Sequence, residues 1–272
     1  MEEADGRLIL HVRDIAQHGC KIVVIRCSDT DIVVWAVSFF HGFQSLGLEE
    51  PWLLFGTAAK KRFIPTHLIA ERLGPQKACA LRGHYAFTGC DQVSFFASKG
   101  KRSVWNAWSD EFTEAFCRLS APDPHPPTDE VMAKLEQFVV KQYDAQSLCT
   151  GVNAARRESF ATKLKHPSII PPTSAALRQH TLRAAYQAGQ VWGSADRIHY
   201  DLPSPSKWGW LMTSSGWESH WTSLESIWPT CRDLSRCGCA SDCSTRRCSC
   251  VRAGVPCAPP CKKCKGDCTN VP

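Results

Sequence analysis

The sequence contains no long apolar run. Its first residues, MEEADGRLILHV, lack the basic start, apolar stretch and small-residue cleavage site of a secretory signal. The longest apolar segments are interrupted by Arg26, Asp29 and Asp31, so none is long enough to cross a membrane. We therefore expect a nuclear or cytoplasmic protein with no membrane partner. Thiols stay reduced in these compartments.

The end of the chain has few apolar side chains but many cysteines. The last thirty-six residues hold nine of the sixteen. A segment so short and so poor in apolar residues cannot bury a core of its own, so disulfides or metal ions must hold it. Clustered cysteines in a reducing compartment usually bind zinc. The candidate ligands are Cys237, Cys239, Cys243, Cys248, Cys250, Cys257, Cys261, Cys264 and Cys268.

The number of thiols predicts the number of zinc ions. Tetrahedral zinc needs four ligands, so about three ions need twelve bonds, which nine thiolates supply if three of them bridge two ions each. Three Zn²⁺ on nine thiolates leave a charge of about −3, which nearby cations must balance. From residue 230 to residue 272, eight lysines and arginines stand against three aspartates, which gives +5 of the chain's net charge of +6. The tail is therefore both a predicted metal site and a basic patch.

The cysteine spacing resembles that of the CXC domain of the tesmin/TSO1 family, and it is similar to the CXC and pre-SET zinc clusters of chromatin proteins. The matching residues are Cys237-Gly-Cys239, Cys243, Cys248-Ser-Cys250, the AGVPC stretch before Cys257, then Cys261, and Cys268-Thr-Asn270. Members of this family bind three zinc ions and many contact DNA. The resemblance thus implies a DNA-binding or chromatin-associated protein. The cations that would contact nucleic acid are Arg246, Arg247, Arg252, Lys262, Lys263 and Lys265.

The tail departs from the family pattern in two places. Cys261-Lys-Lys-Cys264 replaces a late C-x-C, and Arg247 stands where a tyrosine often precedes the second C-x-C. Arg247 would either enter a minor groove or contact only phosphate. The family usually carries two such repeats, and this chain has one. Docking to another protein is the alternative role for the tail.

Residues 1–119 alternate between helical and strand-like segments, which predicts an α/β domain with a parallel sheet. In the Ala4–His18 segment apolar residues recur at helical spacing. The Lys21–Cys27 segment is a β-branched run typical of a parallel strand that is buried on both faces. Further strands are expected at Trp52–Gly56 and Arg62–Ile64, and further helices at His67–Leu73 and Pro75–Phe87.

Acidic residues lie near the ends of these elements. Glu3 and Asp5 head the first helix, Asp29 and Asp31 follow the first strand, and Asp91 follows a helix. The carboxyl ends of parallel strands share one edge of a sheet. Carboxylates that converge there would bind Mg²⁺, and two such ions can clamp the attacking and leaving oxygens of a phosphodiester. The alternative is that Asp29 and Glu3 only cap helices.

The order of these motifs resembles the second half of flap-endonuclease and PIN-like nuclease domains. The motifs are E-A-D, S-D-T-D, G-C-D and then S-K-G-K-R. The resemblance implies that the five acids are Mg²⁺ ligands, and that Lys99, Lys101 and Arg102 form a phosphate-binding turn. Residues 80–108 are also similar to a block found in transposon-derived animal proteins.

Part of the nuclease pattern is absent from the sequence. Such domains have two aspartates before the E-A-D pair, one of them on a central strand. Without that strand its neighbours keep unpaired backbone groups, at about 1–3 kcal/mol for each group that stays dry. We therefore expect an N-terminally incomplete, truncated PIN-like scaffold without catalytic activity. An active Mg²⁺-dependent nuclease specific for structured or single-stranded DNA, targeted by the tail, is the alternative.

The middle of the chain contains few candidate functional residues. A proline-rich linker covers residues 120–128 and precedes a helical and tryptophan-rich region at 129–230, with the zinc cluster at 231–272. Helices are expected at Asp129–Cys149 and Ser174–Trp192. The tryptophans after residue 200 would cap these helices or stack on single-stranded bases. The cysteines before residue 150 are expected to be buried free thiols, and Cys90 with His84 is not expected to form a nucleophilic pair.

Overall fold

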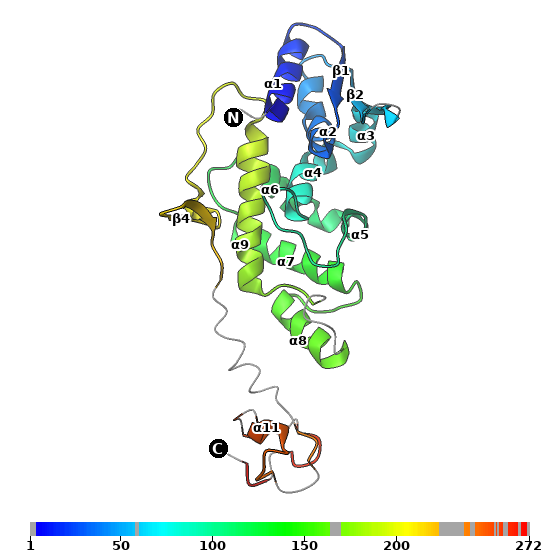
Figure 1. Ribbon diagram of the computed structural model, residues 1–272. Helices are drawn as coiled ribbons and strands as arrows, with labels where there is room; N and C mark the ends of the chain where they lie inside the picture. Colours follow the sequence, from blue (N-terminus) through cyan, green and yellow to red (C-terminus); the bar gives the residue numbers. More distant parts are fainter. Residues whose placement is uncertain are drawn as a thin grey trace. The chain divides into compact units, whose positions relative to one another are not determined.

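The computed structural model describes residues 4–57, 60–163, 170–222, 237–239, 243–252, 254, 256–257, 261–265 and 268–270 (Figure 1). The chain divides into two units, Met1–Trp221 and Thr222–Pro272. The first unit is mixed α/β and the second is a small cysteine-rich cluster. No helix among the described residues has the length and apolar character that a membrane span requires.

A three-stranded sheet lies at one end of the first unit (Figure 1). Its strands are β1 (Ile22–Cys27), β2 (Glu50–Phe55) and β3 (Arg62–Pro65), in that order across the sheet. Helix α2 (Thr30–Gln44) connects β1 to β2, and the two strands are parallel because the chain returns through this crossover. Strand β3 is antiparallel to β2. The sheet is therefore mixed, which corrects the expectation of a purely parallel one.

Strand β1 is buried on one face only, which corrects the prediction that both faces are covered. Val23 and Ile25 are buried, whereas Ile22 and Val24 are 61% and 55% exposed. The strand lies at the edge of the sheet, with β2 as its only strand partner among the described residues. Helix α1 (Ala4–Gln17), close to the predicted Ala4–His18, packs against α2, and Ile9 and Val12 join Val23 and Ile25 in the core. The β-branched run therefore alternates between core and solvent.

Two short helices follow the sheet at the predicted positions. Helix α3 (Thr66–Leu73) ends at Gly74, which takes a φ of 77°, and α4 (Pro75–Phe87) begins with proline at its first position. Helices α5 (Lys101–Asn106) and α6 (Thr113–Ser120) come next, with a 3₁₀ turn at Asp110–Phe112 between them. Helix α6 packs closely on α4.

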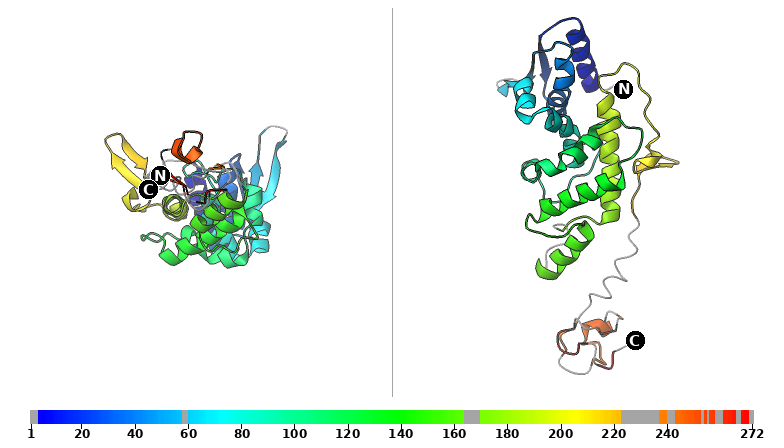
Figure 2. Two further views of the ribbon diagram at one scale, coloured as in Figure 1. Left: turned by 90° about the horizontal axis from the view of Figure 1, so that it is seen from below. Right: turned by 180° about the vertical axis from the view of Figure 1, so that it is seen from behind.

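The remaining helices share the core of the first unit. Helix α9 (Ser174–Ala185) runs beside α4, α6 and α7 (Asp129–Tyr143) (Figures 1 and 2). Phe87 on α4, Phe116 on α6 and Phe138 on α7 contact one another. Residues 121–128 are irregular, as predicted, but they connect parts of one core and do not separate two bodies.

Two predicted helices end earlier than expected. Helix α7 ends at Tyr143 and not at Cys149, and α8 (Val152–Lys163) follows after a loop. Helix α9 ends at Ala185, and the chain continues as a π-helical turn at Tyr186–Val191 and a 3₁₀ turn at Trp192–Ser194.

The tryptophans after residue 200 divide into two sets. A 3₁₀ turn at Pro205–Lys207 leads to Trp208, which is buried against Tyr186 with ring centroids 5.7 Å apart. Strands β4 (Trp210–Thr213) and β5 (Gly216–Ser219) form a hairpin, drawn in yellow in Figure 2. Trp217 and Trp221 are exposed, and Trp228 lies outside the described residues.

Candidate functional site

In the described part of the second unit, the cysteine side chains bring their sulfur atoms close together. Cys237 Sγ lies 3.7 Å from the Sγ atoms of Cys243 and Cys264, and 3.9 Å from that of Cys257. Four sulfurs at about 2.3 Å from one tetrahedral zinc ion would be about 3.8 Å apart. A disulfide needs about 2.05 Å. The spacing therefore fits metal ligation and excludes disulfides between these sulfurs.

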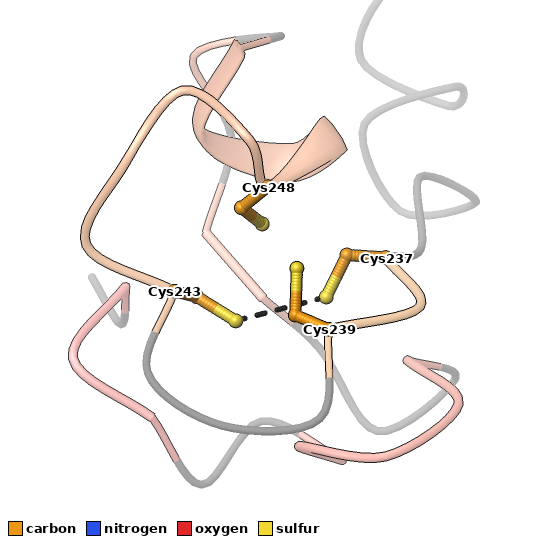
Figure 3. Close-up of side chains that lie close together, drawn as sticks. All are labelled: Cys237, Cys239, Cys243 and Cys248. Atoms are coloured by element: carbon orange, nitrogen blue, oxygen red, sulfur yellow. Dashed lines mark hydrogen bonds between the residues drawn. The ribbon is translucent and has the colours of Figure 1, made fainter.

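Three groups of four cysteines each bring their sulfurs within 4.8 Å of one another. Cys237 belongs to all three groups, which makes it the most shared thiol. Figure 3 shows one group, with the sulfurs of its four cysteines turned toward a common centre. The groups are Cys237, Cys239, Cys243 and Cys248; Cys237, Cys243, Cys257 and Cys264; and Cys237, Cys248, Cys250 and Cys257.

The other two predicted ligands also lie at the cluster. Cys261 Sγ is 3.8 Å from Cys250 Sγ and accepts a hydrogen bond from the backbone N–H of Cys237. Cys268 hydrogen-bonds with Cys243. The structure therefore gathers all nine predicted cysteines around one centre.

Backbone and side-chain hydrogen bonds hold the loops of the cluster together. Lys262 N–H donates to the carbonyl of Cys237 over 3.0 Å, and Cys257 N–H donates to that of Asn270 over 2.7 Å. The Asn270 side-chain amide also donates to Cys257 Sγ. Donors of this kind stabilise thiolate charge and orient metal ligands.

The electrostatics of the cluster fit a bound cation. Enclosure of Cys243 raises the pKa of its thiol well above the ordinary range, and the neighbouring thiols add to this effect. Zinc binds thiolates, so an ion placed among these sulfurs would displace their protons. Clustered cysteines of this geometry can hold zinc.

Exposed cations lie in the same chain segments as the cysteines. Their side chains all face solvent, and within the described part of the chain none of them forms an ion pair. The helix α11 (Ser249–Arg252) carries one of them at its end. They are Arg246, Arg247, Arg252, Lys262, Lys263 and Lys265.

The predicted acids of the first unit come together at the end of β1. Burial raises the pKa of Asp5, and the charge of Asp29 adds to this effect. Burial also raises the pKa of Asp31; Tyr85 opposes the shift through a hydrogen bond, and the charges of Asp29 and Asp91 reinforce it. Four of the five predicted carboxylates, from three separate segments, thus act on one another through their charges, but among the described residues no three of them bring oxygen atoms within 4.8 Å of one another. Glu3 lies outside the described residues.

Asp29 also has the local role that its position suggested. It is the N-cap of α2, and its Oδ1 accepts a hydrogen bond from Asp31 N–H over 2.9 Å. The interpretation of Asp29 as a helix cap is confirmed. As a cap residue, Asp29 still acts through its charge on Asp5 and Asp31.

The three cations predicted to form a phosphate-binding turn have different environments. Lys101 Nζ donates to the carbonyls of Tyr85 and Gly89 and to Thr88 Oγ1, at the end of α4. Burial lowers its pKa to about 8. Lys99 Nζ lies 4.8 Å from the centre of the Tyr143 ring. Arg102 is exposed.

Lys101 is therefore turned toward the protein, next to Asp31 and Tyr85, and not toward an external phosphate. Tyr85 was not singled out from the sequence. Its hydroxyl lies 3.0 Å from Thr30 Oγ1, and burial raises its pKa to about 12. No local motif marks this residue, because α4 reaches the acids only through the packing of the fold.

His84 and Cys90 do not form a catalytic pair. The His84 ring stacks on Trp108 with ring centroids 4.3 Å apart, and burial lowers its pKa to about 3. Burial raises the pKa of the Cys90 thiol. A histidine with so low a pKa is too weak a base to take the proton of a thiol whose own pKa is raised.

A groove of 690 Å³ lies beside α6, α7 and residues 121–128. Its main charges are already paired: Arg118 with Glu114 over 2.9 Å and Lys134 with Glu111 over 3.1 Å. Because these charges are paired with one another, the groove is a weaker candidate site than the cysteine and acidic clusters.

Comparison of the chain with models of protein families, with curated proteins and with solved structures finds no match. The cysteine cluster and the acidic cluster are therefore interpreted from their own geometry.

Proposed function

We propose that this protein binds nucleic acid, with DNA as its main ligand, through a zinc-dependent C-terminal module. The supporting observation is the cluster of close sulfurs together with six exposed cations in the same chain segments. About three zinc ions would fix the loops that carry these cations. A nuclear, chromatin-associated protein of the CXC type accounts for both features.

The surrounding charge favours a polyanion over a neutral protein surface. Lysine and arginine bind nucleic acid largely by neutralising phosphates, which releases condensed counterions. The PIN-like first unit would act as a degenerate scaffold in this proposal. In its candidate turn at Ser98–Arg102, Lys101 and Arg102 are both exposed, but the Lys101 ammonium is already hydrogen-bonded to the end of α4.

Titration of a labelled DNA duplex with the full-length zinc-loaded protein tests this function. With four to six phosphate contacts, the logarithm of the affinity falls against the logarithm of the salt concentration with a slope of about −4 to −5. Chelation of zinc should abolish binding, because the folded cluster arrays the cations. Tight binding that survives chelation would move the contact surface to the first unit and leave the tail with a protein-docking role.

The acidic cluster supports a second candidate, an Mg²⁺-dependent nuclease. Asp5, Asp29, Asp31 and Asp91 interact electrostatically at one end of β1, and converging carboxylates are the ligands that Mg²⁺ prefers. We rank it second because Lys101 lies at the same cluster and supplies a competing positive charge.

Cleavage assays separate the two functions. Flapped or single-stranded DNA with Mg²⁺ or Mn²⁺ should show little or no cleavage by the full-length protein. Robust cleavage that is lost in Asp31→Asn but kept in Asp14→Asn, an exposed acid on α1, would establish the nuclease.

A further inference from the structure

Two cysteines of the first unit face each other across a helix pair. Cys79 lies on α4 and is exposed, and Cys117 lies on α6 and is half-buried. The Cys117 thiol donates a hydrogen bond to the carbonyl oxygen of Gln76 over 3.3 Å, one turn before Cys79 on α4, and the two thiols interact electrostatically. These two were expected to be buried free thiols; both are free, but neither is fully buried.

The packing of α4 on α6 fixes this contact. Gly83, one turn after Cys79, lies so close to α6 that a Cβ there would collide with the carbonyl oxygen of Phe116. Gly83 N–H donates to Ser120 Oγ over 2.8 Å. The absence of a side chain at residue 83 thus lets the backbones approach and brings the two thiols into contact.

A buried cation lies beside the pair. The Arg82 guanidinium donates to Ser38 Oγ over 2.7 Å and to the Ser120 carbonyl over 3.0 Å. Both acceptors are neutral, and Arg82 Nε has no hydrogen-bond partner among the described residues. Cys79, three residues earlier on the same helix, and Asp196 both act on this cation through their charges.

These surroundings favour the thiolate of Cys79. The interaction with the Cys117 thiol is the main cause that lowers its pKa to about 6; partial burial opposes it and the charge of Arg82 supports it. Glu114 on α6 acts in the opposite direction. The thiols of Cys27 and Cys90 differ from that of Cys79, because burial raises the pKa of each of them.

We propose that Cys79 and Cys117 form a dithiol site that hydroperoxides oxidise to a reversible disulfide. An exposed thiolate with a second thiol in contact is the arrangement that such oxidation requires. The site is independent of the zinc cluster and of the proposed nucleic-acid binding.

The reaction takes two steps. The Cys79 thiolate attacks one oxygen of the hydroperoxide: an S–O bond forms, the O–O bond breaks, and the leaving alkoxide or hydroxide takes a proton from water. Cys117 then loses its proton and attacks the sulfur of the Cys79 sulfenic acid. The S–S bond forms, the S–O bond breaks, and the hydroxide leaves as water with the proton of Cys117. Two thiols are oxidised by two electrons, and one hydroperoxide is reduced to an alcohol, or to water, plus one water.

Peptide mapping of the full-length zinc-loaded protein tests the proposal. The protein is treated with one equivalent of hydrogen peroxide, alkylated and digested with trypsin. Cleavage at lysine and arginine places Cys79 in peptide 78–82 and Cys117 in peptide 103–118. We expect a cross-linked pair of these peptides that a thiol reductant separates. Alkylation of both peptides, with Cys20 in peptide 14–21 oxidised equally fast, would overturn the proposal.

Two further measurements test the order of the steps and the need for the fold. In Cys117→Ser, a 1,3-dione probe should label a sulfenic acid on Cys79, whereas in Cys20→Ser the cross-link should form as in the unchanged protein. Loss of the cross-link in Cys20→Ser would show that it arises by exchange and not at this site. A cross-link that forms equally fast in denaturant would also contradict the proposal, because the contact exists only in the folded helix pair.

Discussion

The Sγ atoms of Cys237 and Cys264 lie 3.7 Å apart, although 27 positions separate the two residues in the chain. The C-x-C and C-x-x-C motifs bring together neighbours only. The contact between Cys237 and Cys264 instead depends on how the loops between them return to one centre. Cys237 thereby becomes common to all three groups of four sulfurs.

Replacement of Cys237 should therefore cost more zinc than replacement of a peripheral cysteine. We expect Cys237→Ala to lose more than one of about three bound ions, because bridging thiolates serve several tetrahedral sites. Cys239→Ala is the matched control, since Cys239 belongs to one group and is partly exposed. Metal analysis of the purified proteins decides between them. Equal zinc contents in the two variants would contradict a shared role for Cys237.

Arg247 should contribute more to DNA binding than a lysine that meets only phosphate. If Arg247 enters a groove, Arg247→Ala should weaken binding by about 1–3 kcal/mol, whereas a phosphate-contacting lysine variant lowers the salt slope by about 1. Lys263→Ala is a better control than Lys265→Ala, because Lys265 takes a φ of 49° that strains any side chain there. Fluorescence anisotropy at several salt concentrations measures both effects. Equal losses in the two variants would mean that Arg247 meets only phosphate.

The buried histidines should make the first unit sensitive to acid. Burial lowers the pKa of His84 to about 3 and that of His180 to about 4. Both values lie below the unfolded value of about 6.5, so the unfolded chain binds more protons in this range and stability is lost as the pH falls from about 6.5 toward 4. Each histidine adds at most about 1.4 kcal/mol per pH unit to that loss.

His84→Phe should flatten this dependence. The variant removes one titrating group and keeps an aromatic ring among Trp105, Trp108 and Phe116. Urea unfolding between pH 4.5 and 6.5, compared with the unchanged protein, measures the difference, and acid effects on the zinc cluster cancel in it. An unchanged slope would show that His84 titrates normally in the folded protein.

The rate at which Cys79 is alkylated should depend on pH with an unusually low midpoint. Because its pKa is lowered to about 6, the thiolate persists above this pH, and the rate should fall to half near pH 6. Cys117→Ala removes the neighbouring thiol and should move the midpoint toward the ordinary cysteine pKa of about 8.5. Iodoacetamide labelling of peptide 78–82 at a series of pH values gives the midpoint. A midpoint that does not respond to Cys117→Ala would assign the effect to Arg82 alone.

Helix boundaries could be predicted where the sequence marks them chemically. Gly74 and Pro75 mark the start of α4, and the prediction of Pro75–Phe87 matches its bounds. The end of α7 was placed too late, because the apolar pattern continues into the loop after Tyr143. The exposure of Ile22 and Val24 could not be predicted. A run of β-branched residues has the same sequence pattern whether one or both faces of its strand are buried.

The sequence by itself determined the donor chemistry of both candidate sites. The type and spacing of nine cysteines indicate zinc ligands, and the order of the acids indicates carboxylates at a strand end; both signals are local in the chain. Tertiary structure alone decided which groups meet. Lys101 turns inward to the end of α4, Tyr85 reaches Asp31, and Cys79 contacts Cys117. These contacts depend on how closely helices pack, as at Gly83 against Phe116, and packing distances of this kind arise only when distant segments share one core.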